Sequence, residues 1–400
     1  MKRLLMKTSG TATALALAVL ILPPAFSQGQ SQSGNKSGKN HTFEFTQVVD
    51  TTKGFSSFGV FPAINNHGEV AFTAIRTGHG AGVFRVREEL EKLTTIGSTS
   101  DGLDFFGDDV AVNPDGVVAF GATTTANSRA IFKGDGTSRT LIADSSVNGL
   151  LKIAVGSPSI NAAGVIAFSA VLAQRGSPSS VFTGNGGPLK AVASTSVNGF
   201  QSFGNVAINN SGTVVFPGNL TDGSHGLFTV SGGATIDIVD TATHSEIDSF
   251  GDPVINNAGA IADVAFVLPL FAPEIITGTT RGVTPRNDPT NPAFASTEHP
   301  SINNHGAVAF SAIQVVAGGT SPEGIFLEVS GGRSLIPVVR PGDKLFGSTV
   351  VHANLGRFAL NDRFQMAFSY TLQDGRSGIA IASFEGEGED GGKGGDDSSH

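Results

Sequence analysis

One motif recurs seven times along this chain and limits the folds that it can adopt. In its complete form the motif reads Asn-x-x-Gly-x-x-Ala-Phe, and its anchor asparagines lie 48, 48, 48, 47, 47 and 58 residues apart. These anchors are Asn65, Asn113, Asn161, Asn209, Asn256, Asn303 and Asn361. A repeat period of about 40 to 50 residues is typical of propeller blades, stacked helical pairs or solenoid coils.

The composition of each unit favours strands over helices. The units are rich in Val, Ile, Phe, Thr and Gly, they alternate with period two, and they lack a helical apolar stripe. The first unit predicts four strands, which we name a to d, at 61–64, 69–75, 82–86 and 93–98. The a–b link reads as a hairpin turn in which Gly68 supplies a positive φ.

Recurring phenylalanines predict how the units pack. Strand b is apolar or small on both faces, as expected for a strand that lies between two neighbouring sheets. One set of phenylalanines recurs on strand b: Phe72, Phe120, Phe168, Phe216, Phe266, Phe310 and Phe368. A second set recurs on strand c: Phe84, Phe132, Phe182, Phe228 and Phe326. The fifth unit has three additional residues before Ala265 and Phe266, unless Ala262 and Asp263 are the equivalent pair.

The two ends of the repeat region complement each other. The last unit stops near Phe384 without a strand d, whereas a strand-like segment from Phe43, which resembles the d strands, precedes the first unit. Pairing this segment with the last unit would close a ring and leave no exposed sheet edge. We therefore predict an all-β, seven-bladed β-propeller of four-stranded antiparallel blades over residues 41–384. A different blade count or a solenoid is the alternative.

Both termini differ in composition from the repeats. Residues 1–27 carry basic residues, an apolar run and a small-x-small pattern before Gln28, which predicts a cleaved secretory signal peptide. Residues 28–40 predict a flexible linker, and residues 385–400 a disordered, acidic, Gly-rich tail. No other hydrophobic stretch is long enough to span a membrane. We expect a protein that is secreted, periplasmic or at the cell surface of a bacterium.

The repeated motif resembles the bacterial proteins known as choice-of-anchor tandem repeat NxxGxxAF-containing proteins. It is complete at 65–72, 113–120, 161–168 and 303–310, whereas Val215 replaces Ala in the fourth unit and Phe364 replaces Gly in the seventh. The resemblance implies export, often with a C-terminal sorting anchor. Here the acidic tail stands in that place, which favours release. The resemblance implies no catalytic residue, because the motif is a turn and a packing pair.

Several classes of chemistry are disfavoured by the sequence. The chain has no cysteine, which excludes disulfides and thiolate chemistry, and its net charge of −9 disfavours nucleic acid as a partner. Histidines lack metal-hydrolase spacing, and no Gly-x-Ser-x-Gly elbow is present. No cofactor is expected, except that the local acid cluster could hold Ca²⁺, although its spacing is not that of an EF-hand. The cluster consists of Asp101, Asp104, Asp108 and Asp109.

Variable polar residues gather in the predicted b–c loops, which lie on one rim of a propeller. The candidate ligand-binding residues of this rim are Arg76, His79, Arg129, Arg175, Asp222, His225, Asp374 and Arg376. We expect an exported, non-enzymatic propeller whose loop rim binds an extracellular or envelope protein or glycan. The alternatives are an extracellular hydrolase or lyase with an axial active site, which sequence spacing cannot reveal, and a structural surface component.

Overall fold

A computed structural model describes residues 41–87, 89–153, 157–196, 199–269, 271–279, 282–285, 294–316, 319–329 and 334–387. The predicted signal peptide and linker lie outside these residues, as does the tail from residue 388. The last strand reaches Glu387, three residues beyond the predicted end of the propeller.

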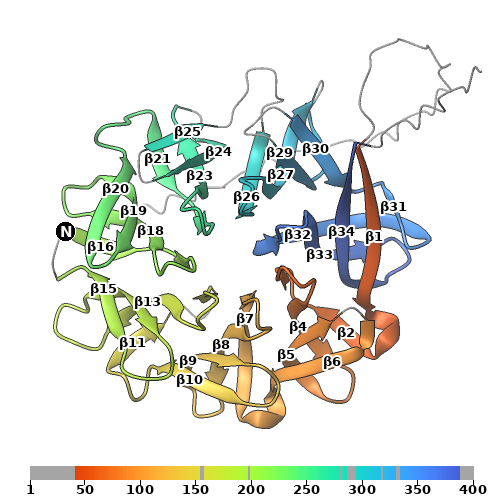
Figure 1. Ribbon diagram of the computed structural model, residues 1–400, viewed down its shortest axis with the longest axis horizontal. Coiled ribbons are helices and arrows are strands. Elements are labelled where there is room, and N and C mark those ends of the chain that lie inside the picture. Colours follow the sequence, from red (N-terminus) through yellow and green to blue (C-terminus); the bar gives the residue numbers. More distant parts are fainter. Residues whose placement is uncertain are drawn as a thin grey trace, which may run out of the picture. The chain divides into compact units, whose positions relative to one another are not determined.

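The described residues form seven antiparallel sheets arranged as blades around an axis (Figure 1). Strand a of most blades is interrupted, so that two short segments pair with one strand b. Blade 1 contains β2 (Phe55–Phe58), β3 (Ala63–Ile64), β4 (Val70–Arg76), β5 (Gly80–Arg87) and β6 (Glu89–Ser98). Blade 2 contains β7 (Leu103–Val112), β8 (Val118–Thr124), β9 (Arg129–Gly134) and β10 (Arg139–Asp144). Blade 3 contains β11 (Leu150–Ile153), β12 (Ser159–Ile160), β13 (Ile166–Leu172), β14 (Ser179–Gly184) and β15 (Lys190–Ser194).

The remaining blades repeat this arrangement. Blade 4 contains β16 (Phe200–Phe203), β17 (Ala207–Ile208), β18 (Val214–Leu220), β19 (His225–Ser231) and β20 (Ala234–Asp240). Blade 5 contains β21 (Ile247–Phe250), β22 (Val254–Ile255), β23 (Ile261–Val267), β24 (Ala272–Thr279) and β25 (Gly282–Pro285). Blade 6 contains β26 (Phe294–Ile302), β27 (Val308–Val316), β28 (Gly319–Thr320), β29 (Gly324–Val329) and β30 (Ser334–Val339). Blade 7 contains β31 (Lys344–Leu345), β32 (Ser348–Leu360), β33 (Gln365–Leu372), β34 (Ser377–Glu387) and β1 (His41–Asp50). Two 3₁₀ turns, η1 (Thr51–Lys53) and η2 (Thr99–Asp101), lead from blade to blade.

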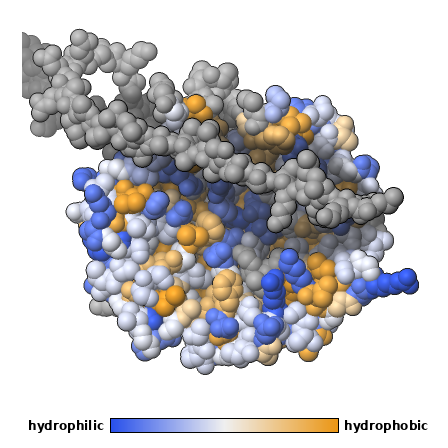
Figure 2. Space-filling view, turned by 180° about the vertical axis from the view of Figure 1, so that it is seen from behind, coloured by the Kyte–Doolittle hydropathy of each residue, from blue (hydrophilic) through white to orange (hydrophobic). Residues whose placement is uncertain are grey.

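This architecture confirms the predicted seven-bladed propeller. The prediction for strand a was too short, because 61–64 covers only its second half and the first half is β2. Between the halves, residues 59–62 leave the regular ladder with strand b. We call the side with the b–c loops and d–a connections the loop rim, and the side with the a–b and c–d turns the turn rim. Figure 2 shows hydrophilic residues gathered near the centre of one face, with hydrophobic residues scattered around them.

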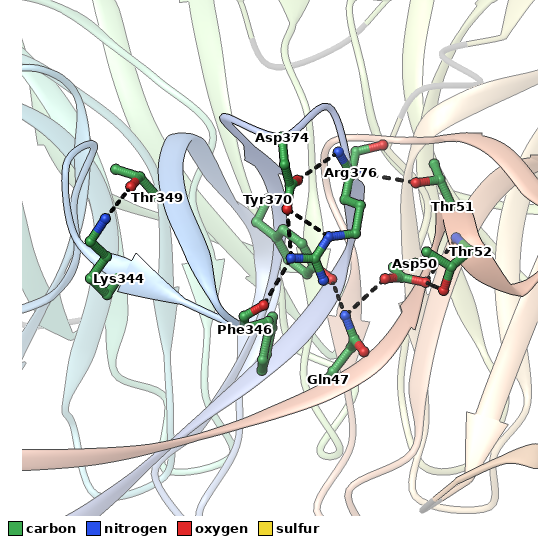
Figure 3. Close-up of polar contacts among 11 residues, drawn as sticks. Gln47, Asp50, Thr51, Thr52, Lys344, Phe346, Thr349, Tyr370, Asp374 and Arg376 are labelled. Atoms are coloured by element: carbon green, nitrogen blue, oxygen red, sulfur yellow. Dashed lines mark hydrogen bonds and ion pairs between the residues drawn. The ribbon is translucent and has the colours of Figure 1, made fainter.

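The N-terminal strand closes the ring as predicted. β1 pairs antiparallel with β34, and Val49 lies opposite Ile379. Both side chains are buried in the cluster that joins blade 7 to blade 1. A polar network covers this seam (Figure 3), where Gln47 Nε2 donates hydrogen bonds to the Tyr370 hydroxyl at 2.7 Å and to Asp50 Oδ2 at 3.1 Å. The closing strand is therefore held by buried packing and by hydrogen bonds.

The phenylalanines pack between blades, with one exception. Phe72 of strand b lies opposite Phe84 of strand c, and the same pairing recurs in blades 2, 3, 4 and 6. In blade 5 the register places Ala262 opposite Val254, as Ala71 lies opposite Ala63 in blade 1. The prediction for Phe266 was therefore wrong, and Asp263 occupies the place of the strand-b phenylalanine. Asp263 is fully buried, whereas Phe266 is half-buried.

The anchor asparagines form a closed ring of hydrogen bonds that the sequence did not predict. Each Asn Oδ1 accepts a backbone N–H of its own turn, as Asn256 does from Ala260 at 2.8 Å. Each Nδ2 donates to the carbonyl of the next anchor, and the bond from Asn361 to Asn65 at 3.0 Å closes the circle. The other six bonds run from Asn65, Asn113, Asn161, Asn209, Asn256 and Asn303 to the following anchor. All seven residues are buried, so the repeated asparagine fixes both the turn and the neighbouring blade.

Candidate ligand-binding site near the propeller axis

A single variable position places different side chains at the axis. It lies four residues before each anchor asparagine, where strand a leaves its ladder, and it is followed by residues that the repeats share. We call these seven residues the axial ring. They are Phe61, Asp109, Ser157, Asn205, Asp252, His299 and Arg357. The three positions that follow it hold small or apolar residues in every unit, so the change of charge and polarity at this position stands out.

Contacts between blades show that these side chains meet near the axis. The Phe61 ring of blade 1 packs at a tilt against the His299 ring of blade 6, with ring centroids 4.3 Å apart, although blade 7 lies between these blades in the ring. Ser157 Oγ donates to Asp109 Oδ2 at 2.8 Å. Asn205 Nδ2 donates to Asp252 Oδ1 at 3.0 Å.

Arg357 crosses the channel from blade 7. Its Nη2 donates to the carbonyls of Val206 at 3.1 Å and Pro253 at 2.6 Å, which belong to blades 4 and 5. The residue comes from an extended bulge in β32, where the register jumps from Leu355 to Leu360. Phe358 of the same bulge packs against four of the hydrophobic clusters between blades. Arg357 and Phe358, which we call the plug, therefore pack at the axis against residues of several other blades.

Two buried carboxyl groups lie in this central layer. Burial raises the pKa of Asp109, and the nearby Arg357 charge and the hydrogen bond from Ser157 oppose that rise. Burial raises the pKa of Asp263 well above its ordinary value, and the charge of Asp252 adds to this rise. Asp263 Oδ1 accepts the Val264 N–H at 2.8 Å. Asp263 therefore keeps its proton to a higher pH than an exposed aspartate does.

A pocket of about 510 Å³ opens beside the axial ring, between blades 4, 5 and 6. Its polar side chains are Ser202, Asn219, Asp252, Thr297, Glu298 and His299. Its aromatic side chains are Phe203, Phe250 and Phe266. We call it the blade 5 pocket. It borders blade 5, where Asp263 replaces the packing phenylalanine and the next residue, Val264, lines the pocket.

The charged groups of the blade 5 pocket come from strand a of two blades. The Asp252 carboxylate follows β21 and is held by Asn205 of the neighbouring blade. Glu298 and His299 lie in β26, and the His299 Nε2 atom is 3.8 Å from the Glu298 carboxylate. The Glu298 side chain is 57% exposed, whereas that of His299 is 20% exposed. Glu298 can therefore reach a ligand from solvent, while His299 is fixed against Phe61.

A smaller cavity of about 160 Å³ lies on the turn rim. Five of the seven anchor asparagines line it, together with Arg357 and Phe358. The residues directly after the anchors also bond from blade to blade in part of the ring. The Asn304 N–H donates to Asp362 Oδ1 at 2.7 Å, and the Asp362 N–H donates to Asn66 Oδ1 at 2.9 Å. These amide groups are used by the protein itself, so this cavity offers fewer free groups than the blade 5 pocket.

The predicted rim residues do not converge on one site. Arg76 and His79 line a separate pocket on blade 1, and Asp374 pairs with Arg376 at 2.7 Å. The Arg376 guanidinium also donates to the Phe346 carbonyl, so this pair supports the seam of the ring (Figure 3). His225 contacts Asn219 through its ring nitrogen at 2.6 Å. The others, Arg129, Arg175 and Asp222, are exposed and line no pocket described here.

The predicted calcium residues are also separated by burial. Asp101 accepts hydrogen bonds from Ser98 and lies 3.4 Å from Arg139. Asp104 and Asp108 are exposed on β7, whereas Asp109 is buried in the axial ring. Among the described residues, no group of three or more His, Asp or Glu side chains is placed to hold a metal ion. Calcium binding stays a prediction.

Sequence reasoning missed the axial ring because it looked for variation in the b–c loops. Aligning the seven units shows the axial position, because the residue there changes from unit to unit while the next residues stay similar. It is Phe, Asp, Ser, Asn, Asp, His or Arg. The fifth unit carried a second signal in Asp263, which stands where a phenylalanine is expected.

Comparison with known proteins places the chain in a family. The model of a family of unknown function, DUF7453, matches residues 24–283 and 272–380. The chain belongs to this family. No curated protein matches this DUF7453 chain. The choice-of-anchor resemblance is not tested by this match and stays a prediction.

Solved structures similar to this DUF7453 protein include two peptidases. One comes from an analysis of two prolyl endopeptidases, with a TM-score of 0.52 and 11% identity over 82% of this chain and 50% of that one. The other is a puromycin-hydrolyzing peptidase of Mycobacterium tuberculosis, with a TM-score of 0.51 and 10% identity over 82% of this chain and 53% of that one. This chain therefore spans about half the length of each peptidase. At such identities the likeness shows the propeller fold alone. In the part of the chain that the structure describes, no helix has the length and apolarity to cross a membrane.

Proposed function

We propose that this protein is an exported, non-enzymatic propeller that binds a hydroxyl-rich saccharide unit of a cell-envelope glycan in the blade 5 pocket. The observation that carries the proposal is the pocket itself. It combines carboxylates, an amide and hydroxyls with three phenylalanines in a volume of about 510 Å³. Pockets of a few hundred Å³ with a few convergent polar groups are typical of small-ligand sites.

The residue chemistry of the pocket favours a saccharide. Ionised Asp252 and Glu298 only accept hydrogen bonds, so they match ligand groups that donate, such as hydroxyls. Asn219 Nδ2 donates to Ser202 Oγ at 2.8 Å, so the Ser202 hydroxyl accepts this bond and keeps its own proton for a ligand. The rings of Phe203 and Phe250 offer an apolar surface for the C–H face of a sugar ring. Asn205 orients Asp252 through the bond at 3.0 Å, so the main acceptor is positioned before the ligand arrives.

Export is part of the proposal and is supported by the sequence of residues 1–27 and by the choice-of-anchor resemblance. Intact mass measurement of the protein recovered outside the cytoplasm tests this part. We expect a mature chain that begins at Gln28. An uncleaved chain that stays inside the cell would contradict export, although it would leave the saccharide site untouched.

A glycan array made from envelope polysaccharides, followed by calorimetry on the retained saccharide, tests the binding site. Asp252→Asn and Glu298→Gln each remove a charged acceptor, and we expect each to weaken binding about tenfold or more. Asp248→Asn is the matched control, because Asp248 belongs to the same blade, bonds Ser249 at 3.0 Å and lies outside the pocket. Equal binding by Asp252→Asn and the control, or no retained saccharide, would contradict the proposal.

A glycoside hydrolase is the second candidate. Glu323 lies directly before β29 in blade 6, where burial raises its pKa and the charge of Glu298 raises it further; a raised pKa suits a general acid. Hydrolysis also requires a second carboxylate across the scissile bond. Chromatography of the retained saccharide after incubation separates the two functions. Binding predicts an unchanged saccharide, whereas shortened products that disappear with Glu323→Gln would establish the hydrolase.

A further inference from the structure

A second pocket lies on the loop rim of blade 1 and differs in charge from the blade 5 pocket. Its volume is about 520 Å³, and Arg76, His79, Ser98, Thr99 and Ser100 contribute to its lining. No acidic residue lines it, in a chain with 34 acidic and 25 basic residues. We call it the blade 1 pocket.

The Arg76 charge in this pocket is not neutralised by a neighbour. Among the described residues, no ion pair or side-chain hydrogen bond involves its guanidinium. Asp101 follows the serine and threonine residues of the pocket in sequence. Its carboxylate accepts the Ser98 N–H at 2.9 Å and lies 3.4 Å from the Arg139 guanidinium. The positive charge of Arg76 is therefore available to a ligand.

The loop geometry brings the donors of this pocket together. Gly78 and Gly80 have φ values of 76° and 78°, which turn the b–c loop so that His79 lies between them. A Cβ atom on Gly80 would collide with the Thr99 hydroxyl, so this glycine allows the loop to pack against η2. The Ser98 and Ser100 hydroxyls lie 2.6 Å apart, and the Ser98 hydroxyl donates to Asp101 Oδ2 at 3.0 Å. A guanidinium, an imidazole and three hydroxyls thus share one pocket.

We infer that the blade 1 pocket binds a sulfate or phosphate oxyanion. Arginine donates several N–H groups in a fixed plane, and charge-assisted hydrogen bonds to oxyanions are stronger than neutral ones. The Thr99 hydroxyl, which lines the pocket and is not bonded to Asp101, adds a donor of adjustable direction. The site is separate from the blade 5 pocket, so the failure of either proposal leaves the other intact.

Calorimetry of the intact protein with sodium sulfate and with sodium phosphate, at ionic strength held constant with sodium chloride, tests this inference. We expect saturable binding of one oxyanion per chain. Arg76→Gln should weaken it about tenfold or more. Arg129→Gln is the matched control. Arg129 is exposed at the start of β9, so this substitution removes the same charge outside the pocket. The control should bind as the parent protein does.

Two further comparisons make the test decisive. Dextran sulfate and neutral dextran distinguish a polysaccharide ester from a free ion: stronger binding of dextran sulfate identifies the ester, and equal binding of sulfate alone identifies the ion. If Arg76→Gln fails to fold, His79→Gln takes its place. It should also bind the oxyanion more weakly than Arg129→Gln does, although the loss of affinity should be smaller than for Arg76→Gln. Absence of sulfate and phosphate binding, or equal losses in the pocket variant and Arg129→Gln, would overturn the inference.

Discussion

The ring of anchor asparagines makes a strong prediction at Asn256. Its Nδ2 donates to the Asn303 carbonyl of the next blade at 2.9 Å, and its Oδ1 accepts the Ala260 N–H at 2.8 Å. Asn256 is 6% exposed, so water cannot readily replace these bonds. Asn256→Ala removes both bonds, and each contributes a net stabilisation of about 1 kcal/mol.

The size of the effect follows from these two bonds. The Asn303 carbonyl keeps the Gly306 N–H as a partner, whereas the half-buried Ala260 N–H loses its side-chain acceptor, so the loss should be at least the sum of the two bonds, about 2 kcal/mol. For a domain of about 350 residues with an unfolding entropy of about 2 cal/mol/K per residue, this loss lowers Tm by about 3 °C. Urea unfolding and differential scanning calorimetry both measure it.

The Asn256→Asp variant separates the two bonds. It keeps the turn acceptor but places a carboxylate oxygen against the Asn303 carbonyl at neutral pH. Because the buried carboxyl should have a pKa above its value in the unfolded chain, the native state gains a proton as pH falls, and stability relative to the parent should recover. Asn185→Ala is the control, since Asn185 is exposed. A Tm change below about 1 °C in Asn256→Ala, or an unaffected Asn256→Asp at pH 7, would refute a role for the ring in stability.

Three further predictions concern the seam and the axis. Val49→Asp places a charge in the buried pairing of β1 with β34 at Ile379, and should cost more than about 3 kcal/mol and speed amide exchange in β1; unchanged exchange would contradict the role of this strand. Asp263→Asn should raise Tm more at pH 8 than at pH 4, because the raised pKa of Asp263 means that native stability is lost as pH rises towards that pKa; a pH-independent difference would contradict the assignment. Arg357→Met removes two carbonyl bonds and the charge that favours ionised Asp109, and should cost about 3 kcal/mol in urea unfolding; a variant as stable as the parent would show that the plug is dispensable.

The architecture could be predicted because its determinants are local and repeated. The turn at Gly68 and the alternation in strand b are properties of short segments. Because the unit occurs seven times, a departure in one copy, such as Phe364 in place of Gly, did not obscure the pattern. The surplus strand at one end and the missing strand at the other also predicted the pairing of β1 with β34. The register of blade 5 was left between two alternatives, since Phe266 matched the motif and Asp263 matched the spacing.

The candidate site could not be predicted in the same way. Asn205 and Asp252 are 47 residues apart, and Phe61 meets His299 only because the ring closes. Such contacts follow from the circle and not from sequence spacing. The variable b–c loops drew attention to Asp374 and Arg376, which the structure uses at the seam. Comparing the seven units position by position would have found the axial ring.

A crystal structure of the protein with the saccharide retained on the array tests the central claim most directly. We expect density for a sugar ring between β16, β21 and β26, with hydroxyls within about 3 Å of Asp252 and Glu298. A saccharide bound on another blade, with this pocket empty, would contradict it.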